Sequence, residues 1–317
     1  MPTIEAGLTD RIGNRDVILS FSGGKDSTAC GLWLQEAGIP FRALFLDTGW
    51  EHRDTYAHVK KLESRFGPVI RVSSQIEPVP EYADEIAAFE ARLGWPSPMV
   101  RWLAKKAMFP SRKRRWCTEQ LKTFPFIAFA EQHDVEIVNV LGIRRDESEA
   151  RATWPEREQH PDAPSVEVWA PLIHWTVDDV IAIHKRHDVE PCPLYLRGSS
   201  RVGCWPCINS NREELRALAR DPERVDILRD LEAFVGRIAL EREHKYQNGN
   251  LPTFFQARIE EKGKPTRYPS WPIDKVLAWS NRTPGSRRWQ MDLFAAIPTE
   301  AGCARWGMCE HPSRKGV

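Results

Sequence analysis

The stretch VILSFSGGKDSTACGLW, residues 17–33, decides the fold of this chain. It begins as a mostly apolar, β-prone run, breaks into small polar residues, and continues with a helical composition. A strand that runs through a glycine-rich turn into a helix leaves the first N–H groups of that helix unpaired, beside the positive end of its dipole. This order of elements predicts a cradle for a phosphate group.

The residues of the turn support the same prediction. Gly23 and Gly24 permit positive φ and a close approach of the backbone. Lys25 adds a mobile positive charge. The turn also has two hydroxyl donors, Ser22 and Ser27. The spacing Gly-x-x-x-x-Gly-Lys-Ser/Thr of GTPases is absent. The alternative is a glycine-rich turn whose Lys25 and Asp26 are simply solvated.

Short β-prone runs alternate with helical patterns through the first half of the chain. We predict strands at Val17–Phe21, Ala43–Leu46, Val69–Val72, Ile137–Leu141 and Val166–Trp169. Between them, Ser27–Ala37 and Tyr56–Phe66 have helical patterns. This alternation predicts an α/β fold with a mostly parallel, doubly wound sheet and helices on both faces. Ligands of such sheets bind at the carboxyl ends of strands, here at the loops after the first, second and fourth strands.

The second half of the chain is predicted to be more helical. Thr176 begins a plausible capped helix with Asp178 and Asp179 in its first turn. Residues 211–218 and 222–246 have charged, amphipathic helical patterns. We expect a nucleotide-binding domain over residues 1–190 and a helical, cysteine-bearing region over residues 191–317.

Composition limits the classes of protein that the chain can belong to. The 317 residues have 41% hydrophobic and 28% charged residues and a net charge of +1, as in ordinary globular proteins. Any basic surface must therefore be local. Residues 1–16 do not resemble a secretory signal, and no apolar run reaches the length of a membrane span. We expect a cytoplasmic protein without a membrane partner. We also expect most of the 13 Trp to pack rather than to stack on bases.

Four motifs together resemble a known superfamily. SFSGGKDS (20–27) is similar to the signature of the PP-loop ATP pyrophosphatases, which cut ATP between the α- and β-phosphates. The stretches FLDTGWEHRDTYAHV (45–59), RRWCTEQLK (114–122) and GIRRDESEAR (142–151) resemble the phosphoadenylyl-sulfate reductase-like branch. The resemblance implies an adenine nucleotide α-hydrolase-like fold that binds ATP, adenylyl sulfate or its 3′-phosphorylated form.

The resemblance also implies roles for individual residues. The nucleotide phosphates would be held by Ser22, Gly23, Gly24, Lys25, Asp26 and Ser27. Asp26 would help to place Mg²⁺. Asp47 and Thr48 would lie beside the nucleoside, with Glu51 in reach, unless this stretch is only a strand-terminating turn. Lys25, Asp26, Arg144 and Arg145 would act in catalysis.

Two arginine-rich stretches, residues 142–151 and Arg112–Arg115, can each be interpreted in two ways. Gly142 would let the substrate approach the backbone, and Arg144, Arg145 and Arg151 would clamp an anion. The mixture of Arg with Asp146, Glu147 and Glu149 could instead pair with itself. The run Arg112–Arg115 is either a solvated loop or a contact to the phosphates of a large substrate.

The cysteines point to metal or redox chemistry. Cys204 and Cys207 flank two residues, so both sulfurs can reach one metal. The further candidate ligands are Cys117, Cys303 and Cys309. Four thiolates suit zinc or an iron–sulfur cluster, and a metal-free redox pair is the alternative. We expect Cys30 and Cys192 to be structural.

The resemblance favours a [4Fe–4S] cluster, with zinc as the alternative, and makes Cys117 a ligand or the sulfur-handling thiol. However, assimilatory reductases of this kind have paired cysteines where only Cys117 stands here, and RWGMCEHP (305–312) is not their C-terminal Glu-Cys-Gly motif. The arrangement of the cysteines is closer to that of the cluster-bearing relatives that move sulfur in DNA phosphorothioation or phage defence.

Three functions follow from this resemblance. The first is an ATP pyrophosphatase that adenylates an acceptor, which the resemblance implies is nucleic acid, and replaces the activated oxygen by sulfur from a cysteine desulfurase-type donor. The second is a sulfonucleotide reductase that releases sulfite with a thioredoxin-type reductant. The third is a non-catalytic nucleotide-binding subunit of a defence complex.

Overall fold

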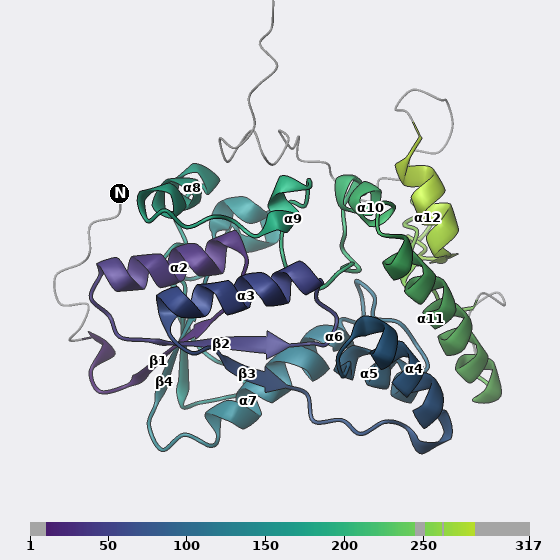
Figure 1. Ribbon diagram of the computed structural model, residues 1–317, viewed down its shortest axis with the longest axis horizontal. Helices are drawn as coiled ribbons and strands as arrows, with labels where there is room; N and C mark the ends of the chain where they lie inside the picture. Colours follow the sequence, from purple (N-terminus) through teal and green to yellow (C-terminus); the bar gives the residue numbers. More distant parts are fainter. Residues whose placement is uncertain (1–10, 245–250, 262, 283–317) are drawn as a thin grey trace, which may run out of the picture.

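The computed structural model describes residues 11–244, 251–261 and 263–282 (Figure 1). Its helices and strands form, in chain order, β1 (Asp16–Ser20), α2 (Lys25–Glu36), β2 (Arg42–Asp47), α3 (Arg53–Phe66), β3 (Ile70–Ser73), η1 (Pro80–Tyr82), α4 (Ala83–Leu93), α5 (Pro98–Lys106), α6 (Trp116–Thr118), η2 (Glu119–Thr123), α7 (Phe124–Ala130), β4 (Ile137–Leu141), η3 (Arg145–Glu147), η4 (Glu149–Arg151), β5 (Arg157–Gln159), β6 (Val166–Trp169), α8 (Val177–Arg186), α9 (Pro193–Leu196), α10 (Arg212–Leu218), α11 (Pro222–Glu241), β7 (Phe255–Gln256), β8 (Ser270–Trp271) and α12 (Ile273–Ser280).

One sheet of six strands organises the first half of the chain. Its order is β3-β2-β1-β4-β6-β5, and every pair is parallel except β5 with β6. The five predicted strands are therefore confirmed within one or two residues at their ends. The antiparallel edge strand β5 was not predicted, because its residues Arg-Glu-Gln are polar and too few to show a period.

The side chains of the central strand alternate between two hydrophobic cores. Val17 and Leu19 point to the face that α2, α3 and α8 cover, whereas Ile18 points to the face that α7 covers. Figure 1 shows α2 and α3 on one side of the sheet and α7 on the other. The predicted doubly wound arrangement is confirmed, since alternate residues of a strand face opposite sides.

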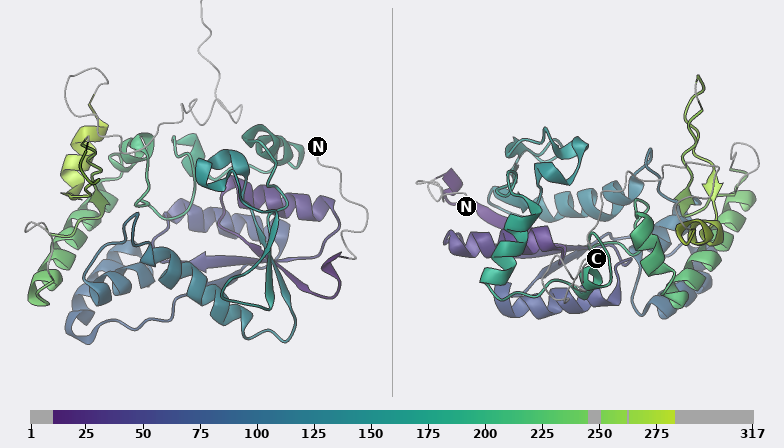
Figure 2. Two further views of the ribbon diagram at one scale, coloured as in Figure 1. Left: turned by 180° about the vertical axis from the view of Figure 1, so that it is seen from behind. Right: turned by 90° about the horizontal axis from the view of Figure 1, so that it is seen from above.

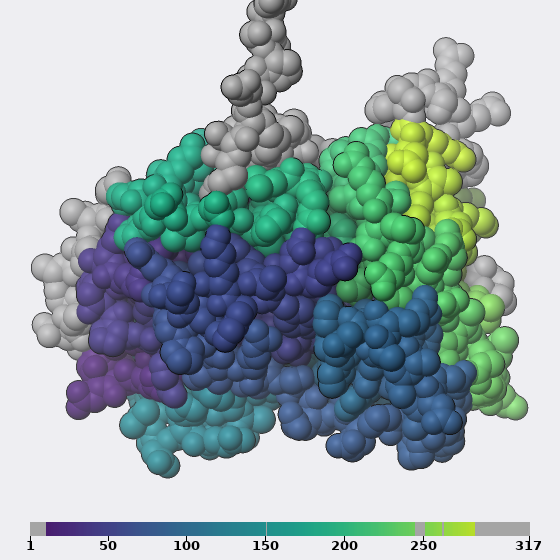
Figure 3. Space-filling model, in the orientation of Figure 1, coloured from purple at the N-terminus to yellow at the C-terminus, as the bar shows by residue number. Residues whose placement is uncertain are grey.

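A third core lies beside the sheet. Helices α4 and α5 pack there with α10, α11, α12 and the β7–β8 pair, around the fully buried Trp50. The space-filling view shows the blue surface of α4 and α5 directly against the green of α11 (Figure 3), and the view from above places α11 and α12 beside the sheet (Figure 2). A segment from before residue 190 thus shares a core with helices after it. The domain boundary near residue 190 stays a prediction.

Helix starts follow local capping. α2 begins at Lys25, two residues earlier than predicted, because the extended Gly24 serves as its N-cap. The predicted cap of α8 is confirmed: Thr176 and Asp179 form a capping box. No helix in the described residues is long and apolar enough to cross a membrane.

Glu232 on α11 anchors the chain that follows that helix. Its two carboxylate oxygens accept hydrogen bonds from the backbone nitrogens of Phe254 and Ile273, each at 3.1 Å. Burial raises the pKa of Glu232 to about 7. One side chain therefore holds both ends of the segment that contains β7 and β8.

We predict that Glu232→Ala destabilises the fold by roughly 2 kcal/mol at pH 5, since it leaves two backbone N–H groups without an acceptor. The ordinary pKa of this carboxyl, 4.5, applies to the unfolded chain, and the folded value is about 7. Between these two pH values the folded protein binds more protons at Glu232 than the unfolded chain does. The free energy of unfolding should therefore fall as pH rises in wild type. Urea unfolding at pH 5 and pH 8 measures both effects. Glu241→Ala, an exposed change on the same helix, is the control, and equal pH slopes in wild type and Glu232→Ala would contradict the prediction.

Candidate active site

Hydrogen bonds to the Ser27 hydroxyl join the two ends of the loop after β1. The Ser22 N–H donates to Ser27 Oγ at 3.2 Å, and Ser27 Oγ donates to the Gly24 carbonyl at 3.1 Å. Gly23 has φ +69°, and a Cβ atom there would lie 2.8 Å from Val59 Cγ2. The glycine and the two serines therefore fix the turn that opens α2.

A segment from much later in the chain covers this loop. The Lys25 N–H donates to the hydroxyl of Tyr195 at 3.0 Å, and Lys25 Nζ donates to the Ser200 carbonyl at 3.4 Å. The Lys25 ammonium also lies 5.3 Å from the centre of the Tyr195 ring. Tyr195 is buried, and no sequence pattern singled it out. Its hydroxyl takes one of the helix N-terminal N–H groups that suit a phosphate oxygen.

Asp26 is held between two cations. Its carboxylate lies 3.1 Å from Lys25 Nζ and accepts a hydrogen bond from Arg144 Nε at 2.6 Å. Burial opposes the ionisation of Asp26, but Lys25 and Arg144 outweigh it and hold its pKa below the usual value. Each carboxylate oxygen has one of these cations as its partner. The predicted role of Asp26 in placing Mg²⁺ stays a prediction.

Gly142 is where the end of β4 meets the start of α2. A Cβ atom at this position would lie 2.7 Å from the carbonyl carbon of Asp26 and 2.7 Å from the nitrogen of Ser27. Glycine is required because the close neighbour is backbone, which cannot swing aside. The start of α2 needs this space, and the predicted approach of a substrate to Gly142 stays a prediction.

The three arginines of the predicted clamp have separate partners. Arg144, 3% exposed, pairs with Asp26 and also contacts Asp146. Arg145 donates to the carbonyl of Trp154 through Nε at 3.1 Å and through a terminal nitrogen at 3.0 Å. Arg151 pairs with Glu147. Arg151 thus pairs within its own stretch, as the alternative interpretation expected. Arg144 instead reaches Asp26 at the loop after β1.

His184 of α8 contacts the first turn of α2. Its Nε2 lies 2.9 Å from the Lys25 carbonyl, and its Nδ1 lies 3.2 Å from the Val189 carbonyl. Burial lowers its pKa. A neutral imidazole has one N–H, so it donates to one of these two carbonyls at a time.

The loop after β2 carries a buried hydrogen-bond network. Thr48 Oγ1 donates to Glu51 Oε1 at 2.7 Å, and the Tyr56 hydroxyl bridges Asp47 at 2.7 Å and Glu51 at 3.1 Å. Thr48 and Glu51 are both almost fully buried. Burial raises the pKa of Glu51. Asp47, Thr48 and Glu51 thus lie together as predicted, although the nucleoside contact stays a prediction.

The first cysteine of the Cys-x-x-Cys pair lies against this loop. The backbones of Glu51 and Cys204 form an antiparallel bridge, and the Trp205 N–H donates to the Trp50 carbonyl at 2.8 Å. Thr48 Oγ1 is 3.8 Å from Cys204 Sγ. The thiol therefore lies at the carboxyl end of β2.

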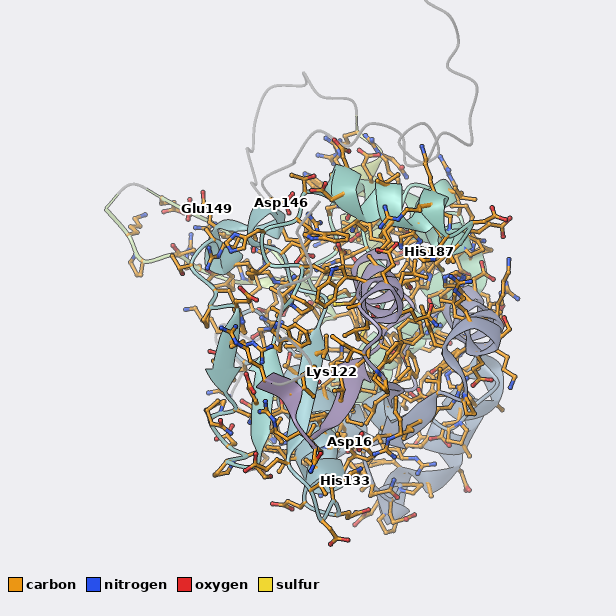
Figure 4. All side chains as sticks on the ribbon, turned by 90° about the vertical axis from the view of Figure 1, so that its left-hand side faces the viewer. Asp16, Lys122, His133, Asp146, Glu149 and His187 are labelled. Atoms are coloured by element: carbon orange, nitrogen blue, oxygen red, sulfur yellow. The ribbon has the colours of Figure 1, made fainter. Side chains whose placement is uncertain are left out.

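Lys122 is a site residue that the sequence analysis missed. It lies in η2, a π-helical turn, which is often found at functional sites. Figure 4 labels it in the interior of the view, whereas Asp146 and Glu149 lie in the upper left part and Asp16 and His133 in the lower part. Cys204 and Glu51, when they are ionised, raise the pKa of Lys122 despite its burial. The sequence signal that could have identified Lys122 is its position five residues after Cys117, a predicted ligand.

The three described candidate ligands share this environment. Lys122 interacts electrostatically with Cys204, Cys207 and Cys117. Burial raises the pKa of Cys204 to about 12, and Lys122 opposes that rise. Burial and the neighbouring Cys207 also raise the pKa of Cys117. The thiols of Cys117 and Cys204 are therefore mainly protonated at neutral pH.

The predicted metal site is incomplete in the described residues. There, no three His, Cys, Asp or Glu side chains are arranged to hold a metal ion. Cys303 and Cys309 lie outside the described residues. A tetrahedral site needs four ligands. The residues at hand thus do not fit a cluster or zinc by themselves, and the ligand set stays a prediction.

The two cysteines that we expected to be structural are buried. Cys30 has no exposed surface in α2, and Cys192 is 1% exposed. Burial raises the pKa of both thiols, that of Cys192 to about 11. Their burial accords with the expected packing role.

The chain is similar to known proteins over more than half of its length. The phosphoadenosine phosphosulfate reductase domain model matches residues 16–210, more than half of the chain. An uncharacterised 37.8 kDa protein of Escherichia phage 186 is 34% identical over 332 residues, which cover 92% of this chain and 96% of that protein.

More distant similarity extends to named reductases. An adenosine 5′-phosphosulfate reductase of Deinococcus radiodurans is 28% identical over 184 residues, 57% of this chain. The match covers 63% of that reductase, less than two thirds of its length. The crystal structure of a phosphoadenylyl-sulfate reductase from Candida auris, in its phosphate complex, has a TM-score of 0.46 at 17% identity and covers 62% of this chain and 84% of that one.

We predict that Gly142→Ala weakens nucleotide binding at least tenfold, because the added methyl group would push the first turn of α2 out of place. Gly236→Ala is the matched control. A Cβ atom there meets nothing closer than 3.5 Å, so this mid-helix change should be neutral or stabilising. Binding of a fluorescent ATP analogue, with thermal unfolding in parallel, tests both variants. Wild-type affinity in Gly142→Ala would show that the contact has no bearing on the cradle.

Proposed function

Since the chain belongs to the phosphoadenosine phosphosulfate reductase domain family, we propose that it is an enzyme that binds an adenine nucleotide at the loop after β1 and activates it for sulfur transfer. One observation carries the proposal. The segment 195–207 touches the phosphate-type loop through Tyr195 and the β2 loop through Cys204. A nucleotide in the cradle would therefore have its reacting end beside thiols.

The first step is assigned to the cradle. The N–H groups of α2 and the Lys25 ammonium would bind the phosphates of ATP, and Arg144 would keep Asp26 and Lys25 in position. An acceptor oxygen attacks the α-phosphorus of ATP, and the bond to the β-phosphate oxygen breaks. Pyrophosphate leaves, and the acceptor carries AMP. The role of Asp26 in helping to place Mg²⁺ stays a prediction, and no step is assigned to the metal.

The second step is assigned to the cysteines. One of Cys117, Cys204 and Cys207 would carry a persulfide supplied by a cysteine desulfurase-type donor. The terminal sulfur displaces AMP and forms an acceptor–S–S–cysteine bond. A second cysteine attacks the cysteine sulfur of that bond, which releases the acceptor as a thiolate and leaves a protein disulfide. A thioredoxin-type reductant would return the disulfide to two thiols. Buried thiols ionise poorly, and the Lys122 ammonium favours their thiolate form.

The similarity to adenosine 5′-phosphosulfate reductases favours a second candidate reaction. A thiolate would attack the sulfur of adenylyl sulfate, AMP would leave, and the enzyme would carry an S-sulfocysteine. A second thiol would then attack the cysteine sulfur, release sulfite and form a disulfide. This reaction needs the same cradle and two thiols but no ATP cleavage.

Two product assays separate these reactions. We expect pyrophosphate release from ATP in the presence of acceptor and donor, and no sulfite from adenylyl sulfate with dithiothreitol. Sulfite without pyrophosphate would assign the reductase reaction. Tight ATP binding with neither product would leave a non-catalytic nucleotide-binding subunit and refute the enzyme.

We predict that Lys25→Ala lowers the turnover of whichever reaction is found by about a hundredfold, the usual effect of removing a group that stabilises developing charge. Lys60→Ala is the matched control, because Lys60 is exposed on α3 and pairs only with a neighbouring carboxylate in that helix. Steady-state rates of both variants under saturating nucleotide provide the measurement. Equal rates for Lys25→Ala and wild type would remove Lys25 from the proposed chemistry.

The metal is a separate proposal with its own test. We expect anaerobically purified full-length protein to contain about four irons per chain and to absorb broadly near 400 nm, as thiolate-bound clusters do. Cys207→Ser should remove this iron. If the protein contains one zinc per chain and does not absorb near 400 nm, the site is a zinc site and not a cluster.

A further inference from the structure

Lys25, the first residue of α2, is contacted in three ways by residues from much later in the chain. Its N–H donates to the Tyr195 hydroxyl at 3.0 Å, and its ammonium donates to the Ser200 carbonyl at 3.4 Å. Its carbonyl lies 2.9 Å from His184 Nε2. The first two contacts use the N–H and the ammonium, which are the groups that the proposed function assigns to phosphates. A bound nucleotide would therefore compete with Tyr195 and Ser200 for Lys25.

These two competitors are not fixed equally firmly. Ser200 is anchored to the start of α10, because its hydroxyl donates to Glu214 at 2.7 Å and accepts from Asn211 Nδ2 at 3.0 Å. Tyr195 lies on α9, a helix of only four residues. Gly198 separates α9 from Ser200; it has φ +97°, and a Cβ atom there would meet nothing within 4 Å. The chain can therefore bend at Gly198 and move α9 while Ser200 stays in place.

A small set of contacts holds α9 in its position. Its two buried residues pack in a cluster that is separate from the three cores of the fold. The buried members of this cluster are Ile181, Cys192, Leu194 and Tyr195. Arg197, just after α9, pairs with Asp54 of α3, but its side chain is 52% exposed, and exposed ion pairs contribute little to stability. Segments with few buried apolar contacts open at a low cost in free energy. Helix α9 can therefore leave the cradle without unfolding the sheet.

The present position of α9 leaves a polar group of the same segment unsatisfied. Ser199 is 4% exposed, and within the described part of the chain its hydroxyl has no hydrogen-bond partner. Buried hydroxyls are normally paired, because an unpaired one loses its hydrogen bonds to water without compensation. A shift of α9 would bring this hydroxyl to water. This gain offsets part of the cost of opening.

A phosphate oxygen is a stronger acceptor for the Lys25 N–H than the hydroxyl that now holds it. Burial raises the pKa of Tyr195 well above its usual value, so this hydroxyl is neutral. Hydrogen bonds to ionised acceptors are roughly twice as strong as those between neutral groups. The N–H also lies at the positive end of the α2 dipole, which favours an anion. A phosphate is therefore able to take this N–H from Tyr195.

We propose that α9 is a latch on the cradle: the Tyr195 hydroxyl occupies the place of a phosphate oxygen on the Lys25 N–H, and a nucleotide polyphosphate displaces it on binding. A ligand without phosphate leaves the latch closed. The proposal rests on the proposed function only in placing the phosphates of a nucleotide at the loop after β1. It adds that this loop is closed until the phosphates arrive.

Isothermal titration of full-length wild type and Tyr195→Phe with ATP, tripolyphosphate and adenosine tests the latch. The substitution keeps the ring and removes only the hydroxyl. ATP and tripolyphosphate should bind the variant about fivefold more tightly, which corresponds to about 1 kcal/mol, the usual net contribution of one neutral hydrogen bond. Adenosine should gain no affinity. Tyr82→Phe is the matched control, because the Tyr82 hydroxyl bonds to Glu241 at 2.7 Å, away from the cradle, and it should bind all three ligands like wild type.

The outcomes separate the latch from the proposed function. Equal ATP affinity of wild type and Tyr195→Phe would overturn the latch and leave the nucleotide-binding enzyme standing. Weaker ATP binding by the variant would make Tyr195 a ligand of the nucleotide and would also overturn the latch. If neither protein binds ATP, the latch and the proposed function are both refuted.

A second measurement uses wild type alone. ATP and tripolyphosphate should accelerate trypsin cleavage after Arg197 about threefold, since a displaced α9 no longer contacts α3 and opens more readily. Adenosine should not change this rate. Cleavage after Arg237, on α11, is the internal control and should be the same with every ligand. Slower cleavage after Arg197 in the presence of ATP would show that α9 closes over the ligand, which contradicts the latch.

Discussion

The buried ion pair between Arg144 and Asp26 is the constraint on which the arrangement of the site depends. A guanidinium that is 3% exposed needs a carboxylate partner, because an uncompensated buried charge is strongly destabilising. The pair can form only if the loop after β4 reaches the first turn of α2, and Gly142 permits this approach. The two central strands, β1 and β4, thus determine where the cradle lies.

A second tie joins the sheet to the helical region. The segment 195–207 leaves the cradle at Tyr195 and reaches the β2 loop at Cys204, where Trp205 and Trp50 are joined through their backbones. Trp50 is fully buried in the core that α4, α5 and α11 share. The thiols are therefore held by the packing of this third core and positioned by the edge of the sheet. A change in the third core or in the sheet would move them relative to the cradle.

Charge is organised differently in the two halves of the site. At the cradle, Asp26 pairs with Lys25 and Arg144, and Asp146 also contacts Arg144, so a nucleotide would gain mainly from N–H groups and from the Lys25 ammonium. At the thiols, Lys122 is surrounded by groups that become negative, with Glu51 among them. The first half suits a phosphate that arrives charged, whereas the second suits a thiol that must lose a proton. This division fits a reaction in which activation precedes sulfur chemistry.

The sequence alone determined the strands, the cradle and the candidate cysteines, because apolar period, glycine-rich turns and Cys-x-x-Cys spacing are local signals. It identified Ser22, Lys25 and Asp26 through their place between a strand and a helix. It could not show that Tyr195 covers Lys25, that Arg151 pairs with Glu147, or that Lys122 lies among the thiols. These are contacts between segments whose positions depend on the packing of whole elements. The tertiary structure alone decided them, since burial and close approach, unlike residue type, are properties of the folded chain.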